Sequence, residues 1–446
     1  MPVDLNLIGA KILIDNDLIE CGIAVDEGKI HKIGKPVNLP KAVNAVDVKG
    51  NLVLPGLIDI HVHLRDLDLS YKEDFKSGTC AAAAGGFTTV LDMPNTKPPT
   101  NSPDRLKEKI ERASRQLVVN TGFYGDFPIE IKNFNEMAQL GVIGFKVNLY
   151  NPTTELNVDN DALLLEALKQ ASELNCVTAI HAEDRSTVTG LERSLQQIGK
   201  TSLDAYLEAH PPNAEIIAVE RMLKLIKESG VHGHFSHISV AETIPLIEKA
   251  KQEGLSLTCE VTPHHLFLTE IELRRLGGIA LTDPPIRSRS NATRLWDGLE
   301  EHVIDVIASD HAPHLMREKE KANIWEIPPG IPGLETTLPL LLTKVNRREM
   351  SLRRLIKVLA EKPAEIFGLR GKGFLTTGFD ADLTVIDLKR KFTIDASKFY
   401  SKAKYSPFDG WQLTGKTAKT FVGGQLVMED GEIVAEPRSG RVLGAK

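Results

Sequence analysis

Two histidines separated by one residue, His61 and His63, follow an apolar run that ends at Ile58. In a β-strand alternate side chains point to the same face, so both imidazoles would face the same way. Imidazole nitrogens are common ligands of Zn²⁺, and two on one face provide half of a metal site. The pair alone is a weak signal, because a His-x-His sequence in a chain of 446 residues also occurs by chance.

Further candidate ligands close other apolar runs. They are Lys146, His181, His237 and Asp310. Four imidazoles and a carboxylate can hold two divalent ions, and this mixture of nitrogen and oxygen ligands suits zinc. An isolated histidine is more often a buried core residue, and an isolated Asp310 could cap a following helix. Five independent structural roles at five strand ends would be a coincidence, and one shared site explains the pattern better. The sequence therefore predicts a two-metal centre.

Lys146 requires separate chemistry, because an ammonium group repels cations and has no lone pair to donate. A lysine at the surface or in an ion pair is the ordinary alternative. If the neutral amine adds carbon dioxide, the resulting carbamate is an anion with two oxygens that can bridge two metals. We therefore expect Lys146 to be N6-carboxylated.

These ligands need a fold that brings distant strand ends together. Candidate strands recur eight times, and amphipathic segments of helical period, clearest over Asn213–Glu228, separate most of them. The predicted strands are Leu52–His63, Phe87–Met93, Leu117–Gly125, Val142–Val147, Val177–Glu183, His232–Ser239, Leu257–His265 and Val303–Asp310. This alternation predicts an α/β fold with a parallel (β/α)8 TIM-type barrel, whose chemistry gathers at the carboxyl ends of the strands. The alternative, an open doubly wound sheet, would not readily bring five strand ends to one point.

The two flanks of the chain have a different pattern. Short alternating stretches, such as Ala10–Ile14 and Gly22–Val25 near the start and Ala381–Ile386 near the end, are separated by glycine-rich turns. Such stretches are typical of β-hairpins. We expect a small β-sandwich domain built from both chain termini, residues 1–54 and 372–446, beside a barrel at residues 55–371.

Composition excludes several classes of function. The net charge of −6 is mild for 446 residues and gives no support for binding nucleic acid or anionic membranes, which favour basic patches. The four cysteines are far apart and form no Cys-x-x-Cys pair. The N-terminal sequence does not resemble a signal peptide, and no apolar run has the length of a membrane span. We therefore expect a cytoplasmic protein with reduced thiols.

Several strings in the chain resemble the dihydroorotases of the cyclic amidohydrolase superfamily. They are Asp59–Arg65, Gly85–Val90, Asp92–Thr96, Glu260–Leu266, Asp310–His314 and Pro332–Thr336. The resemblance covers essentially the whole chain, flanks included. Hydantoinases and allantoinases share the metal scaffold but do not usually combine these strings.

The resemblance implies reversible cyclisation of N-carbamoyl-L-aspartate to L-dihydroorotate, the third step of de novo pyrimidine (UMP) biosynthesis. It implies a metal-bridging hydroxide as nucleophile, with Asp310 as metal ligand and proton shuttle. It also implies Arg65, Asn95 and His314 as substrate-binding residues, and the planar fork of Arg65 would suit a carboxylate. The resemblance therefore implies that the binding partner is a small-molecule substrate. A homodimer and an association with aspartate transcarbamoylase are both compatible with the resemblance.

One position departs from the family pattern. Asp283 stands where the family string normally has an asparagine that contacts substrate, and an ionised carboxylate cannot donate a hydrogen bond. Asp283 is therefore protonated, or turned away, or the substrate preference differs. Whether Glu260 contacts a metal also stays open.

Two alternative functions stay open on the sequence alone. The first is a hydantoinase- or allantoinase-like cyclic amidase, which a panel of substrates would separate from a dihydroorotase. The second is a catalytically inactive homologue that acts as a structural partner. Because inactive homologues typically lose metal ligands and this chain retains all of them, the second alternative is the weaker.

Overall fold

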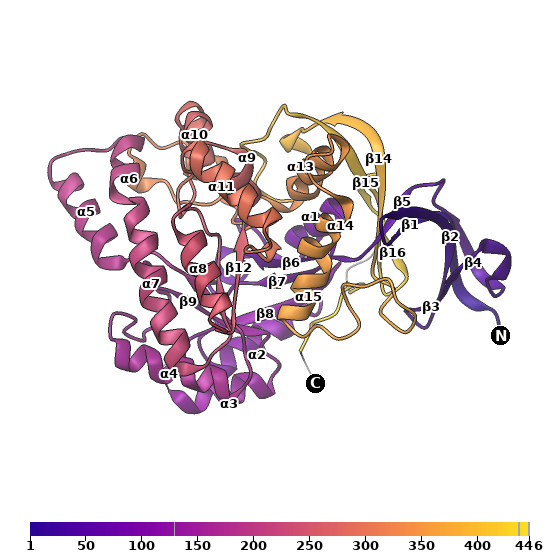
Figure 1. Cartoon of the computed structure of the whole chain (residues 1–446), viewed down its shortest axis with the longest axis horizontal. Helices are drawn as coiled ribbons and strands as arrows, with labels where there is room; N and C mark the ends of the chain where they lie inside the picture. Colours follow the sequence, from indigo (N-terminus) through magenta and orange to yellow (C-terminus); the bar gives the residue numbers. More distant parts are fainter. Residues whose placement is uncertain (129, 436–437, 445–446) are drawn as a thin grey trace.

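The computed structural model describes residues 1–128, 130–435 and 438–444. Figure 1 shows helices surrounding parallel strands in one part of the molecule and a long, largely antiparallel sheet beside it. The beginning of the chain, in indigo, and its end, in yellow, lie side by side in that second sheet. None of the helices in the described ranges has both the length and the apolar character that crossing a membrane requires.

Eight parallel strands form the barrel. They are β6 (Leu57–Val62), β7 (Phe87–Asp92), β8 (Asn120–Asp126), β9 (Gly144–Asn148), β10 (Thr178–His181), β11 (Gly233–Phe235), β12 (Leu257–Val261) and β13 (Val306–Ile307). A parallel bridge between Val62 and His311 connects the two edges, and the buried Asp59 carboxylate accepts a hydrogen bond from the Ser309 amide at 3.2 Å. The predicted barrel is therefore confirmed, and the open doubly wound sheet is excluded.

Helices cover the outside of the barrel and its carboxyl end. They are α1 (Phe75–Gly85), α2 (Pro103–Ala113), α3 (Ile131–Gln139), α4 (Asp161–Glu173), α5 (Arg185–Gln197), α6 (Leu203–Ala209), α7 (Pro212–Ser229), α8 (Thr243–Gln252), α9 (Pro263–Phe267), α10 (Glu270–Leu276), α11 (Arg289–Glu300), α12 (Met316–Lys319), α13 (Leu334–Asn346), α14 (Leu352–Ile356) and α15 (Lys362–Ile366). The helix predicted at Asn213–Glu228 is α7. Asp74 and Ser77 form a capping box at the start of α1, and Gly86, with φ of 93°, ends that helix.

The second sheet has nine strands and draws them from both ends of the chain. They are β1 (Val3–Ile14), β2 (Asp17–Asp26), β3 (Lys29–Gly34), β4 (Ala42–Asp47), β5 (Leu52–Pro55), β14 (Leu383–Thr393), β15 (Gln412–Val422), β16 (Gln425–Glu429) and β17 (Glu432–Ile433). Antiparallel pairing of β5 with β14 joins the two halves, and Leu7, Ile23, Val53 and Leu383 are among the residues of its own apolar core. The composite origin of this part is confirmed, while the division at residues 54/55 and 371/372 stays our proposal.

Six of the predicted strands end earlier in the structure than the sequence suggested, and two of the predicted segments differ for a clear physical reason. The segment Leu52–His63 is divided at Gly56 between β5 in the terminal sheet and β6 in the barrel. A Cβ at Gly56 would lie 2.2 Å from the Thr88 hydroxyl, so the crossing between sheets requires glycine. The segment Leu257–His265 ends as a strand at Val261, because Pro263 begins α9, which Thr262 caps.

A buried ion pair ties α2 to the barrel strand that precedes it. Lys109 Nζ lies 2.7 Å from Asp92 Oδ2, and both side chains are completely buried. Asp92 also accepts a hydrogen bond from the Leu64 amide at 2.7 Å, just after the predicted ligand His63. The pair therefore supports the backbone that carries the first predicted metal ligands.

We expect Lys109→Met to destabilise the protein by about 3–5 kcal/mol, because it leaves a buried carboxylate without its cation. Lys107→Met on the same helix is the control, since Lys107 lies 3.9 Å from Asp104 in an exposed pair. That change should cost less than about 1 kcal/mol. Urea unfolding of the metal-loaded proteins measures the loss of stability in both variants. Equal unfolding midpoints for Lys109→Met and Lys107→Met would refute a special contribution of the buried pair.

Candidate metal centre and substrate pocket

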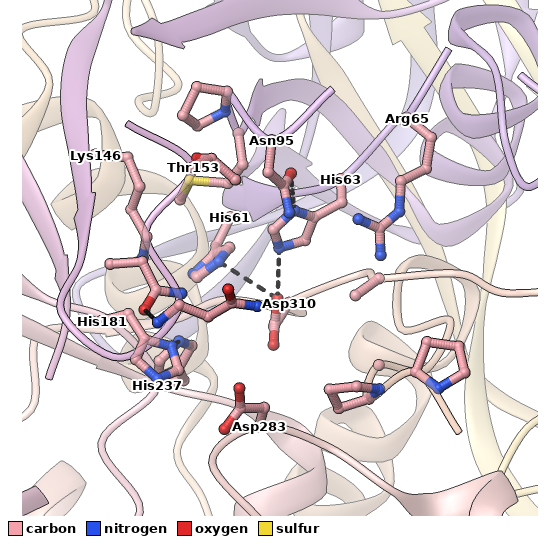
Figure 2. A pocket seen from close by; sticks show the side chains of 18 of the residues that line it. His61, His63, Arg65, Asn95, Lys146, Thr153, His181, His237, Asp283 and Asp310 are labelled. Atoms are coloured by element: carbon pink, nitrogen blue, oxygen red, sulfur yellow. Dashed lines mark hydrogen bonds and ion pairs between the residues drawn. The ribbon is translucent and has the colours of Figure 1, made fainter. Parts of the chain in front are cut away.

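The six predicted metal ligands meet at one cavity at the carboxyl end of the barrel. His61 lies in β6 and His63 directly after it, Lys146 lies in β9, His181 ends β10, and His237 and Asp310 follow β11 and β13. The cavity has a volume of about 240 Å³, and all six side chains line it (Figure 2). The shared placement at strand ends therefore produces one site.

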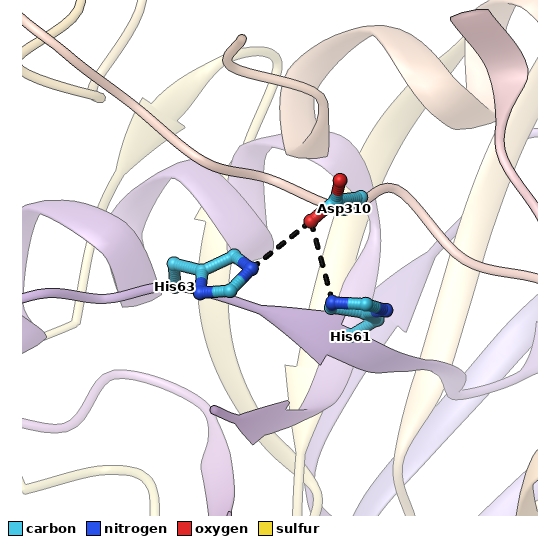
Figure 3. Close-up of side chains that lie close together, drawn as sticks. All are labelled: His61, His63 and Asp310. Carbon is cyan, nitrogen blue, oxygen red and sulfur yellow. Dashed lines mark hydrogen bonds and ion pairs between the residues drawn. The ribbon is translucent and has the colours of Figure 1, made fainter. Parts of the chain in front are cut away.

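His61, His63 and Asp310 form the first group of candidate ligands (Figure 3). The Asp310 Oδ1 atom lies 3.3 Å from His61 Nε2 and 3.0 Å from His63 Nε2. Burial alone would raise the pKa of Asp310, but the two imidazoles hold it well below its usual value. A carboxylate facing two imidazole nitrogens is a suitable donor set for a divalent cation.

His181, His237 and Lys146 form the second group. His181 Nδ1 lies 3.1 Å from His237 Nε2, and the ring of His237 lies 5.3 Å from that of His61 in the first group. Burial lowers the pKa of both His181 and His237, so their rings are neutral and can offer lone pairs to a metal. The two groups together can accommodate two ions.

Lys146 has the surroundings expected of a lysine that reacts as a neutral amine. It is only 8% exposed, and its Nζ donates a hydrogen bond to Ser236 Oγ at 2.7 Å. Lys146 makes no ion pair with a described residue, and burial lowers the pKa of Lys146 to about 8 against the opposing charges of Glu260, Asp310 and Asp126. A buried cation without a counterion is unfavourable, so the neutral amine and its anionic carbamate both fit this position.

Polar side chains behind the ligands orient them. Glu260 binds His61 Nδ1 and accepts a hydrogen bond from the His237 amide at 3.2 Å. Asn95 Oδ1 lies 2.6 Å from His63 Nδ1. Such partners fix the tautomer of a metal-binding histidine and direct its other nitrogen to the metal. The sequence left open whether Glu260 contacts a metal. In the structure Glu260 contacts the predicted ligand His61 and is not among the residues that line the cavity.

Arg65 lies across the cavity from Lys146, His181 and His237 (Figure 2). It is 8% exposed, its Nε has no hydrogen-bond partner, and it makes no ion pair with any described residue. A buried guanidinium without an anion is costly, so this side of the cavity is suited to a negatively charged group. His314 Nε2 lies 3.3 Å from Arg65 Nη2 and faces the same region.

Asn95 and Asp283 also line the cavity, with their polar groups used differently. The Asn95 oxygen is engaged by His63, which leaves its amide nitrogen for a substrate. Asp283 has not turned away, because its carboxyl group faces the cavity 3.5 Å from His210 Nδ1 (Figure 2). Burial and the neighbouring Glu183 raise the pKa of Asp283 well above its usual value. A protonated Asp283 can donate the hydrogen bond that asparagine would supply.

Sequence reasoning missed one acidic residue of the cavity wall. Asp126 ends β8, lines the cavity and accepts a hydrogen bond from Thr153. Burial raises the pKa of Asp126 to about 6. The strand predicted here ended at Gly125, one residue before Asp126. A carboxylate at the carboxyl end of a barrel strand was the signal that could have identified Asp126 as a site residue.

Backbone strain accompanies three of these residues. Arg65, His237 and Asp310 have φ values of 57°, 34° and 46°, in the left-handed region that non-glycine residues rarely adopt. Such conformations cost free energy and concentrate at functional sites, where surrounding structure enforces them. The side chains of all three line the same cavity.

Comparison with known proteins identifies the family. A family model described as "Amidohydrolase family" matches residues 52–427. The chain belongs to the amidohydrolase family. This amidohydrolase is 42% identical to the dihydroorotase of Methanothermobacter thermautotrophicus, over 97% of this chain and 95% of that protein. It is 35% identical to the L-hydantoinase of Paenarthrobacter aurescens, over 99% of this chain and 98% of that protein.

A solved structure shows the same architecture. The L-hydantoinase (dihydropyrimidinase) from Arthrobacter aurescens superposes on this amidohydrolase with a TM-score of 0.94 and 34% sequence identity. The match covers 99% of this chain and 100% of that one, so it includes the barrel and the terminal sheet. Dihydroorotases and hydantoinases both hydrolyse cyclic amides, and the substrate must therefore be argued from the side chains of the cavity.

Proposed function

We propose that this amidohydrolase is a dihydroorotase, which interconverts N-carbamoyl-L-aspartate and L-dihydroorotate in de novo pyrimidine biosynthesis. The observation that carries the proposal is the buried guanidinium of Arg65, which makes no ion pair with any described residue, leaves its Nε without a hydrogen-bond partner and faces the candidate metal ligands. Dihydroorotate carries a ring carboxylate that simple hydantoins lack, and a planar guanidinium can bind it through two hydrogen bonds. The near full-length similarity to dihydroorotases supports this substrate.

We propose that His61, His63, His181, His237 and Asp310, together with an N6-carboxylated Lys146, hold two divalent ions. Their nitrogen and oxygen donors suit zinc, and the position of Lys146 suits an anionic bridge. When bound, the ions would lower the pKa of water and polarise the ring carbonyl. The neutral imidazoles and the ionised Asp310 are the protonation states that metal binding requires.

In the proposed mechanism Asp310 moves the proton. During hydrolysis it takes a proton from the attacking water and delivers it to the ring nitrogen as the carbon–nitrogen bond breaks. Arg65 and His314 hold the ring carboxylate on the other side of the cavity, while the Asn95 amide is placed to contact it. Cyclisation reverses these steps, with the same carboxyl group giving its proton to the departing oxygen.

The direct test combines metal analysis with a panel of substrates. Protein purified without chelator should contain close to two divalent ions per chain and catalyse both dihydroorotate hydrolysis and carbamoyl-aspartate cyclisation. Hydantoin and dihydrouracil, which lack the carboxylate, should be poorer substrates. Faster turnover of either neutral ring would show that the dihydroorotase assignment is wrong, and absence of metal would contradict the proposed centre.

A hydantoinase-like amidase is the second candidate, favoured by the TM-score of 0.94 with an L-hydantoinase. The same substrate panel separates the two. An inactive structural homologue is disfavoured, because all six predicted ligands meet in one cavity. Cytoplasmic location, a homodimer and association with aspartate transcarbamoylase stay predictions, and light scattering with and without the transcarbamoylase would test the last two.

We expect Arg65→Lys to weaken recognition of the carboxylate, because lysine retains the charge but loses the planar fork. The loss in kcat/KM for dihydroorotate should correspond to roughly 1–3 kcal/mol, as for other charge-assisted hydrogen bonds. Turnover of dihydrouracil should change little. Arg105→Lys is the control, since Arg105 pairs with Glu108 on the exposed surface of α2. Equal losses with both substrates would contradict a role in carboxylate binding.

A further inference from the structure

Lys72 lies directly behind His314 and belongs to neither the cavity lining nor the metal-ligand groups. Its Nζ is 2.9 Å from His314 Nδ1 and 2.8 Å from Glu318 Oε1. Lys72 precedes α1, whereas His314 and Glu318 lie before and within α12. The side chain is only 12% exposed, so its ammonium is held between these two partners.

The contacts of His314 select one tautomer. An ammonium group has only donors, so His314 Nδ1 must accept the hydrogen bond from Lys72. The proton of the neutral ring is then on Nε2, which lies 3.0 Å from the Pro329 carbonyl oxygen, an obligatory acceptor. Burial and the positive charges of Arg65 and Lys72 hold the pKa of His314 well below its usual value, so the ring stays neutral. Both ring nitrogens therefore specify the same Nε2–H form.

This tautomer makes one edge of the cavity rich in donors. The His314 Nε2–H and Arg65 Nη2 groups, 3.3 Å apart, are both donors and cannot satisfy each other. Lys319 adds a third cation nearby, with its Nζ bound to the carbonyls of Pro328 at 2.8 Å and Gly330 at 2.9 Å. Glu318 pairs with Lys72 alone among these three cations in the described part of the chain. The edge therefore favours a ligand that brings its own negative charge and acceptors.

We propose that Lys72 is a positioning residue for the substrate carboxylate, because it donates to His314 Nδ1 and so holds the imidazole, whose Nε2–H donates to the Pro329 carbonyl, beside Arg65 at the edge of the cavity. It also contributes a fixed positive charge behind that imidazole. The inference deepens the proposed function and rests on it, since the ligand it specifies is a ring carboxylate. It predicts that discrimination between carboxylated and neutral rings depends on a residue outside the cavity lining.

The tautomer is tested first, by NMR of protein labelled with ¹⁵N-histidine. His314→Gln identifies the His314 signals, which in the wild-type protein should show an unprotonated Nδ1 and a protonated Nε2. Lys72→Met should change the ¹⁵N shift of Nδ1, which loses its hydrogen-bond donor, and Lys72→Arg should preserve the wild-type pattern. A proton on Nδ1 in the wild-type protein, or an unchanged spectrum in Lys72→Met, would overturn the proposal.

Recognition of the carboxylate is tested by calorimetric titration of the zinc-loaded protein with orotate, which keeps the ring carboxylate, and with uracil, which lacks it. Lys72→Met should weaken orotate binding about tenfold or more, as expected for a charge-assisted contact, and leave uracil binding unchanged. Lys72→Arg should recover most of the loss. Lys76→Met, which removes an exposed positive charge on α1, is the matched control. Wild-type protein that prefers uracil would overturn the proposal.

Kinetics separate this inference from the proposed function. With dihydroorotate, Lys72→Met should raise KM about tenfold and change kcat much less, because the reacting groups are untouched. Lys72→Met leaves the carboxylate of Glu318 without its cation, and that carboxylate could itself repel the substrate. In a Glu318→Gln background this repulsion is absent, and Lys72→Met should still raise KM about tenfold. If the wild-type enzyme binds orotate selectively but does not hydrolyse dihydroorotate, the proposed reaction is wrong and the role of Lys72 stands. Unchanged KM in Lys72→Met would refute that role.

Discussion

Asp310→Asn should lower the rates of both dihydroorotate hydrolysis and carbamoyl-aspartate cyclisation by about 10²–10⁴-fold, the usual contribution of a positioned acid–base group. Asparagine retains the size of the side chain and one oxygen that can face His61 and His63, so much of the bound metal should remain. It cannot accept and release a proton at that position. The expected result is therefore a folded, metal-containing protein with little activity in either direction.

The pH dependence distinguishes a proton shuttle from a general disturbance of the site. Carbamoyl-aspartate has one more carboxylate than dihydroorotate, so cyclisation consumes a proton and is favoured at lower pH, whereas hydrolysis is favoured at higher pH. Asp310→Asn should reduce both rates across this range without reversing that preference. Elemental analysis and circular dichroism check metal content and fold, and Asp297→Asn on the exposed side of α11 is the control. Near-normal rates at any pH would move the search for the shuttle to His314.

The barrel and the metal ligands could be predicted from sequence because both depend on local order along the chain. Each ligand closes an apolar strand, and parallel barrel strands all end on the same face. His61, His181 and Asp310 could therefore be grouped before any contact was known. The terminal sheet was predictable for a similar reason, since alternation and turn residues mark hairpins within a few positions.

Other features depend on contacts between distant segments, which a single sequence does not reveal. The division of one apolar run at Gly56 follows from Thr88 and Asp382, which occupy the space a side chain would need. Lys72 and His314 are 242 positions apart, and nothing near either residue indicates that they meet. The orientation of His61 by Glu260 likewise depends on two residues 199 positions apart in the sequence. The periodicity of the sequence predicted the helices and strands, whereas the hydrogen-bond partners could be identified only in the folded structure.

Asp283 illustrates how environment can alter the meaning of a substitution. From sequence, a carboxylate in place of asparagine suggested a lost donor or a changed substrate. In the folded protein Asp283 is half-buried beside Glu183, and like charges at close range favour protonation of one of them. A protonated carboxyl group can replace the amide as a donor, so the substitution is compatible with the proposed reaction. Burial, which decides this outcome, is not encoded at the position itself.

Lys146→Ala should reduce activity by at least about 100-fold, since losing even an outer partner of a metal ligand costs roughly 10- to 100-fold. The physical reason is that the bridge between the two ligand groups must be anionic, and alanine offers no donor at all. Metal content should fall as well, because the His181 and His237 side of the cavity would lose the anionic group proposed to bridge the two ions. Elemental analysis and the hydrolysis assay measure the two losses separately.

Rescue distinguishes a carbamate from an ordinary lysine at position 146. The cavity left in Lys146→Ala has room for a short carboxylic acid, so acetate or propionate should bind there and restore part of both metal content and activity. Lys146→Met is the matched control, because its side chain fills the same space and should prevent rescue. In wild-type enzyme prepared with ¹³C-bicarbonate, a carbamate carbon signal should appear that Lys146→Ala lacks. The carbamate is expected because an ammonium at that position would repel the ions that it is required to bridge. Electron density that ends at a bare amine in an active, metal-loaded crystal would therefore refute the proposal.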